Sequence, residues 1–132
     1  MKLTKTTLLK KKPAISGFGS TQDSVYREFQ EYGGRENVVL PKHLQILYAD
    51  YTYEDYTGDA YVLGFDKQWN KFFEVHGSHC SCYGLEGQWE PEYYEDVKQL
   101  STVIVKRIDS RSEWYRSADS SVEFENWLKG EQ

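Results

Sequence analysis

Apolar and polar positions alternate along the middle of the chain. Leu44, Ile46 and Tyr48 alternate with Gln45 and Leu47, and apolar runs follow at residues 60–65 and 72–75. Polar turn segments separate these runs at residues 57–59 and 66–70. Short strands joined by tight turns are typical of antiparallel sheets, so the pattern predicts a small antiparallel β-meander over about residues 44–76.

Helical spacing precedes this meander. Residues 20–23 have a spacing that resembles a capping box, and Val25, Tyr26, Phe29 and Tyr32 then recur at helical intervals before two glycines. A polar cap followed by an apolar stripe is typical of a helix start. The pattern predicts a helix over about residues 21–32.

Two further helices are predicted after the meander. Pro91, with acids on both sides of it, suits the first turn of a helix over about residues 91–101. Residues 120–123 repeat the capping-box spacing and are followed by an apolar stripe, which predicts a helix over about 121–129. Residues 101–108 fit a strand as well as a helix, and both alternatives stay open.

These elements predict an α+β fold in which helices pack on one face of the meander. With 132 residues the chain has the length of about one average domain. We expect a basic N-terminal arm over residues 1–19 and a single α+β domain over 20–132. A lysine-rich run at 10–12 fits either a solvated tail or an arm that seeks phosphate groups.

Charge is unevenly distributed along the chain. The net charge is −5, but residues 48–100 contain eleven Asp and Glu against three Lys and Arg. The same segment contains at least ten aromatic residues. Nucleic-acid binding needs basic patches, so we expect no direct contact of this segment with nucleic acid. No apolar run is long enough for a membrane span or a signal peptide, and we expect a cytoplasmic protein.

Tyrosines and carboxylates together suggest a protein-binding surface. Aromatic side chains supply contact area, and negative charge steers a basic partner toward them. A solvated hairpin tip whose tyrosines cover the sheet is the alternative. The predicted partner-binding residues are Tyr51, Tyr53, Glu54, Asp55, Tyr56, Asp59, Glu86, Trp89, Glu90 and Glu92.

Histidine and cysteine gather in one short segment. Zinc binds Cys thiolates and His nitrogens, so this segment is a candidate zinc site, although the second ligand pair of a common zinc motif is missing. A thiol activated by histidine and a tight loop with buried thiols are the alternatives. We expect no catalytic residue. The candidate metal ligands are His76, His79, Cys80 and Cys82.

The segment from about 48 to 100, some 40% of the chain, resembles a group of small uncharacterised proteins of bacteriophages and prophages. Its mark is the string GSHCSCYGLEGQWEPE at residues 77–92. The group brings no established activity, cofactor or catalytic residue. The resemblance implies a phage protein made inside a bacterium, where small acidic proteins often inhibit host enzymes or defence systems.

Composition and resemblance together favour a non-enzymatic protein–protein interaction module. We expect a phage-encoded modulator or inhibitor of a host protein, active in host takeover or anti-defence. The partner would be a host protein with a basic surface, such as a nucleic-acid-binding or defence protein. A metal-binding or thiol-dependent protein that uses residues 76–82 is the alternative.

Overall fold

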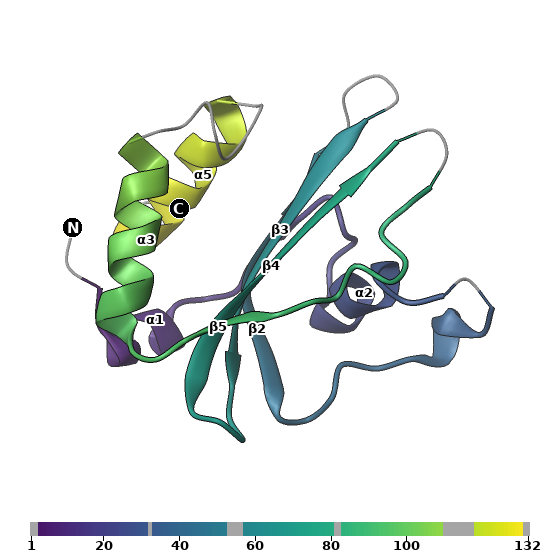
Figure 1. The fold of residues 1–132 in the computed structure, drawn as a ribbon, viewed down its shortest axis with the longest axis horizontal. Coiled ribbons are helices and arrows are strands. Elements are labelled where there is room, and N and C mark those ends of the chain that lie inside the picture. Colours follow the sequence, from purple (N-terminus) through teal and green to yellow (C-terminus); the bar gives the residue numbers. More distant parts are fainter. Residues whose placement is uncertain (1–2, 32, 53–56, 81–82, 110–117, 131–132) are drawn as a thin grey trace.

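The chain folds around a mixed five-stranded sheet with helices on both faces (Figure 1). The computed structural model describes residues 3–31, 33–52, 57–80, 83–109 and 118–130. The predicted α+β class is confirmed. The elements in chain order are α1 (Lys5–Lys10), β1 (Ala14–Ser16), α2 (Gln22–Glu28), the 3₁₀ turn η1 (Arg35–Asn37), β2 (Leu44–Tyr51), β3 (Gly58–Asp66), β4 (Lys71–His79), β5 (Glu92–Tyr94), α3 (Val97–Asp109) and α5 (Ala118–Lys129).

The predicted meander is confirmed as β2, β3 and β4. The three strands pair in antiparallel register, with Val62 opposite both Ala49 and Val75. A register irregularity between Ile46 and Tyr48 turns these two side chains to opposite faces of the sheet. The last strand continues to His79, beyond the predicted end at residue 76.

The N-terminal segment belongs to the sheet rather than forming a solvated arm. β1 pairs in parallel with β2, with Ala14 opposite Tyr48, and becomes one edge of the sheet. Leu8 of α1 is fully buried. The free energy gained by burying apolar side chains of this segment exceeds the cost of ordering a lysine-rich chain. The charge pattern of the sequence did not indicate this burial.

A core layer lies on each face of the sheet. One layer packs Leu8, Leu100, Ile104 and Trp127 from α1, α3 and α5 against the strands. The other layer is covered by α2 and by a loop that contributes Leu85. Figure 1 shows α1, α3 and α5 on one side of the sheet and α2 on the other. The prediction that the helices share one face is therefore wrong.

The predicted helix at 21–32 is present but shorter. Thr21 and Ser24 cap α2 reciprocally, each side chain bonding the backbone N–H of the other. Phe29 ends the helix and is itself buried, so its side chain anchors the C-terminal end to the sheet. The glycines at 33–34 lie beyond this end.

The predicted helix at 91–101 is wrong in its first half. Residues 92–94 form β5, which pairs with β4 through Phe72 opposite Tyr94. The helix α3 starts only at Val97, where Asp96 accepts a hydrogen bond of 2.8 Å from the backbone N–H of Gln99. Residues 101–108, which fitted a strand or a helix, are helical, because Leu100 and Ile104 lie on one face of α3 and are buried against the sheet. The last helix begins at Ala118 rather than near 121.

Candidate functional site

The segment that carries β5 is acidic throughout. Residues 84–96 contain five carboxylates and no lysine or arginine. The side chains of Glu90, Glu92, Glu95 and Asp96 are exposed, and Glu86 is half-buried. Lys71 of β4 pairs with Glu95 at 3.1 Å. We call residues 86–96 the acidic strip.

A clamp on β4 positions the start of the acidic strip. The Gln88 side chain accepts from the N–H of Ser78 at 2.9 Å and donates to the carbonyls of Ser78 and Gly84 at 2.8 Å each. Leu85 is buried beside it. A Cβ at position 77 would press against Leu85 within 3.0 Å, so glycine suits that position. Residues 83–88 of the string at 77–92 thus form a loop folded tightly onto the end of β4.

Aromatic rings connect the strip to the core. Trp89 packs against Tyr26 and Phe73 with ring centroids 5.1 and 5.9 Å away, and Phe73 packs against Tyr93 at 5.9 Å. Trp89 is half-buried, whereas Tyr93 is 41% exposed. The contacts therefore end at the Tyr93 ring, which packs on Phe73 on one side and is open to solvent on the other.

Asp66 bonds the side chain of one exposed aromatic residue and the backbone of another at the hairpin end of β3 and β4. Its buried carboxylate accepts from the Tyr93 hydroxyl at 2.8 Å and from the backbone N–H of Trp69 at 3.1 Å. Trp69 is 63% exposed. Burial, followed by the hydrogen bond and the charge of Asp66, raises the pKa of Tyr93 to about 12. Tyr93 therefore stays neutral, and two large rings are presented next to the acidic strip.

The predicted partner-binding residues divide into two groups. Glu86, Trp89, Glu90 and Glu92 lie in the acidic strip. Tyr51 instead lies inside the core, 6% exposed, so the expectation that it forms part of a surface is corrected. Its ring stacks on Phe18 at 5.1 Å, because the apolar face of β2 continues to the strand end.

Of the other predicted partner-binding residues, only Asp59 falls within the described residues, in β3. Asp59 is half-buried, and its backbone bonds Thr52 across the hairpin. Tyr53, Glu54, Asp55 and Tyr56 lie outside the described residues.

Sequence reasoning missed Tyr93 and Trp69 as surface residues. Tyr93 was assigned to a helix. Its place in a strand, where Tyr93 and Tyr94 point to opposite faces of the sheet, was therefore not recognised. Trp69 lies in a polar turn, and a large aromatic residue at a turn was the available signal. Glu95 and Asp96 continue the acid run that was already noted at 86–92.

The predicted metal ligands do not share one face of the sheet. The His76 ring packs against Tyr61, with centroids 5.2 Å apart, and the His79 ring packs against Tyr51 on the opposite face. This follows from the two-residue period of β4. Cys80 is half-buried and its backbone bridges to Tyr83, while Cys82 lies outside the described residues. In the described part of the chain no three potential ligands gather, and zinc binding stays a prediction.

A buried carboxylate next to these residues serves the fold. Glu74 is fully buried, and its two oxygens accept from the hydroxyls of Tyr61 and Tyr94 at 2.5 Å each. His76 Nε2 lies 3.8 Å from the same carboxylate. Buried charges need such partners. The cluster ties β3, β4 and β5 together and thereby fixes the start of α3.

A comparison with models of known families, with curated proteins and with solved structures finds no match to this chain. Within the described residues, none of the helices combines the length and the apolar character needed to cross a bilayer. A function for this chain therefore has to be inferred from its own residues.

Proposed function

We propose that this chain is a protein–protein interaction module that binds a basic surface of its partner through the acidic strip together with Trp69 and Tyr93. One observation carries this proposal: the Tyr93 ring, held by the buried Asp66, and the exposed Trp69, on a turn whose backbone the same carboxylate bonds, lie beside a run of carboxylates that contains no lysine or arginine. Charged residues alone are common on protein surfaces. A large exposed ring held by a buried carboxylate is less common, and aromatic residues dominate the energetics of interfaces.

The two components have different physical roles in binding. Carboxylates attract a basic partner over distance and raise the association rate, an effect that salt weakens. Aromatic rings that are already immobile lose little conformational entropy on binding. Asp66 restricts the Tyr93 ring through its hydroxyl, and it fixes the backbone of the turn that carries Trp69. The carboxylates of the acidic strip would thus speed association, and the aromatic rings would provide the contact area.

The partner in this proposal is a host protein of the bacterium in which the chain is made, such as a nucleic-acid-binding or defence protein. The resemblance of residues 77–92 to phage-encoded proteins supports a role as modulator or inhibitor. The modest net charge of the chain favours recognition of one basic patch over imitation of a length of DNA, which carries one charge per about 1.7 Å of duplex.

Capture from bacterial lysate tests the proposal. A variant with Glu90→Lys and Glu92→Lys, and a second with Trp69→Ser and Tyr93→Ser, are compared with the wild type. Glu36→Lys, an exposed charge reversal in η1, is the matched control. We expect the wild type and the control to capture the same protein, in a salt-sensitive manner, and both strip variants to lose it. Retention of that protein by the two strip variants would overturn the proposal.

A further inference from the structure

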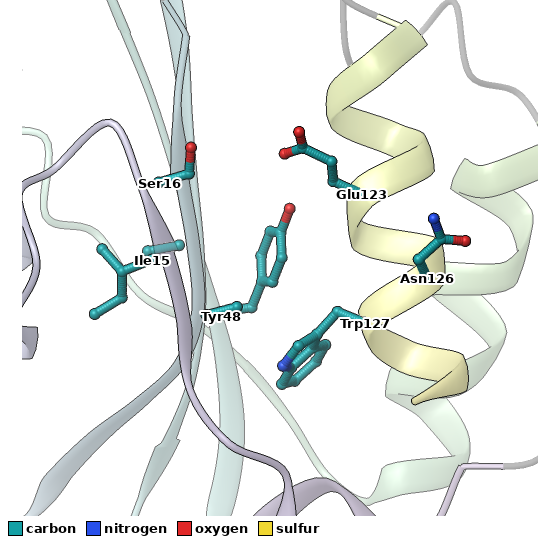
Figure 2. Close-up of a pocket in the computed structure, with 8 residues that line it drawn as sticks. Ile15, Ser16, Tyr48, Glu123, Asn126 and Trp127 are labelled. Atoms are coloured by element: carbon teal, nitrogen blue, oxygen red, sulfur yellow. The ribbon is translucent and has the colours of Figure 1, made fainter. Parts of the chain in front are cut away.

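A cleft of about 330 Å³ lies between the β1 edge of the sheet and α5 (Figure 2). This edge is the opposite end of the strand order from β5. Ile15 and Ala49 pack in the core layer of the other face, so they meet the cleft with their backbone. The residues that line the cleft are Ala14, Ile15, Ser16, Tyr48, Ala49, Glu123, Asn126 and Trp127.

The hydroxyl of Tyr48 is the central polar group of this cleft. Figure 2 shows it pointing into the space between Ser16 and Glu123. The residue is only 3% exposed, and among the described residues no group forms a hydrogen bond with its hydroxyl. The rest of the side chain is buried, and the hydroxyl oxygen is open to solvent in the cleft. A ligand in the cleft would replace that solvent as its hydrogen-bond partner.

The electrostatic environment of Tyr48 is negative. Burial raises its pKa above the ordinary value, and the charges of Asp50 and Glu123 raise it further. Glu123 is exposed and forms no ion pair with any described residue. A field that opposes a tyrosinate anion favours a cation at the same place.

The wall formed by Trp127 is fixed before any ligand binds. Its indole N–H donates to the carbonyl of Lys12 at 2.9 Å, which ties α5 to the segment that leads into β1. Lys11 Nζ lies 5.5 Å from the ring centroid of Trp127. The ring packs against Tyr48 at 5.4 Å. The two sides of the cleft are therefore joined, and little reorganisation is needed on binding.

We propose that this cleft binds a small molecule that carries a protonated amine on a short apolar stem. The ammonium group would donate to the Tyr48 oxygen and to the Glu123 carboxylate, and the stem would lie along Ala14 and Trp127. The cavity volume is near the lower end of the range for ligand pockets, about 300–1,000 Å³, which favours a small occupant. This inference is independent of the acidic strip.

Titration followed by backbone amide NMR tests the inference. Cadaverine is the probe, and 1-pentanol, with a similar stem and no charge, is the control ligand. We expect saturable shifts at the amides of β1 and residues 123–127 with cadaverine only. Tyr48→Phe and Glu123→Gln should each weaken binding about tenfold, the size expected for a lost hydrogen bond to a charged group. Glu92→Gln, on the acidic strip, should change nothing.

Two further measurements make the result decisive. Nα-acetyl-lysine amide presents the same ammonium group as a protein side chain would, and tighter binding of this probe than of cadaverine would overturn the assignment to a free small amine. Tyr48→Phe should leave the free energy of unfolding of the free protein unchanged or raise it, because the hydroxyl bonds no group among the described residues. A clear destabilisation, equal binding of 1-pentanol, or no saturable shift with cadaverine would each contradict the inference.

Discussion

Carboxylates lie at both edges of the sheet, but the two edges differ in shape. At the β5 edge, exposed carboxylates and rings form an open surface with no lysine or arginine between residues 84 and 96. At the β1 edge, α5 covers the sheet, and the Tyr48 hydroxyl and Glu123 face a cleft. The sign of the charge therefore does not indicate what kind of molecule each edge binds. Shape distinguishes an edge suited to a protein surface from one suited to a single ammonium group.

The edges also differ in what holds them to the fold. β1 is held by its parallel ladder with β2, and beside it the Tyr48 ring of β2 packs against Trp127 of α5. β5 is fixed by polar bonds, because Tyr94 reaches Glu74 and Tyr93 reaches Asp66. We expect substitutions at the two edges to have different consequences for stability.

Trp127→Ala should have the largest effect on stability. The residue is 2% exposed, and truncation of a buried tryptophan costs about 3–5 kcal/mol of unfolding free energy. Trp69→Ala at the other edge is the matched change, and an exposed position of this kind should cost about 0.5 kcal/mol or less. Urea denaturation of both variants measures the difference. A larger loss for Trp69→Ala than for Trp127→Ala would contradict this contrast between packing and surface.

Glu74→Ala should loosen the β5 edge specifically. It leaves two buried tyrosine hydroxyls without their acceptor, which should cost about 2 kcal/mol or more. Amide hydrogen exchange should accelerate in β5 and the first turn of α3, and stay slow in β2. Glu74→Gln, whose amide oxygen can still accept one hydrogen bond, should cost less. Equal acceleration in all strands would show that the cluster does not act locally.

Alkaline pH should lower the free energy of unfolding, because Tyr93 at one edge and Tyr48 near the other lose their protons. Because the pKa of Tyr93 is about 12 in the folded chain against an ordinary 10.0, the folded state retains its proton more strongly. The stabilisation is present below pH 10 and is lost as pH rises to 12. The pKa of Tyr48 is shifted in the same direction. Urea denaturation across this window should show a shallower fall for Tyr93→Phe than for the wild type, and an unchanged slope would contradict the Asp66 contact.

Lys71→Met should have the smallest effect on stability. Exposed ion pairs such as Lys71–Glu95 contribute about 0.2–1 kcal/mol. The change also removes a positive charge that faces the acidic strip, so it should strengthen partner capture at low salt. Capture at two salt concentrations, beside the denaturation midpoint, measures both effects. Weaker capture would contradict the electrostatic role of the strip.

Periodicity predicted the parts of the fold that have one clear amphipathic signal. The meander strands follow from alternation and the helix α2 from its apolar spacing, although its cap is formed by Thr21 with Ser24 and not by residues 20–23. β5 was missed because Pro91 and its neighbouring acids suit a helix start. Its three residues form a strand because Tyr94 pairs with Phe72 of β4 and its hydroxyl bonds Glu74. That pairing lies about twenty residues away in sequence and carries no local signal.

The candidate surfaces were predictable only in part. Local composition identified Glu86, Glu90 and Glu92, since their charge depends on no fold. It also selected Tyr51, which the fold buries, and it overlooked Tyr93, which the fold exposes. The cleft at the β1 edge was beyond prediction, because it needs β1 and α5 from opposite ends of the chain.

Capture from bacterial lysate by two variants, one for each edge, tests the central claim most directly. One carries Glu90→Lys and Glu92→Lys in the acidic strip, and the other carries Tyr48→Phe and Glu123→Gln in the cleft. We predict that the strip variant loses the salt-sensitive partner of the wild type and that the cleft variant retains it. Loss by the cleft variant alone, or retention by the strip variant, would contradict the assignment of the partner to the β5 edge.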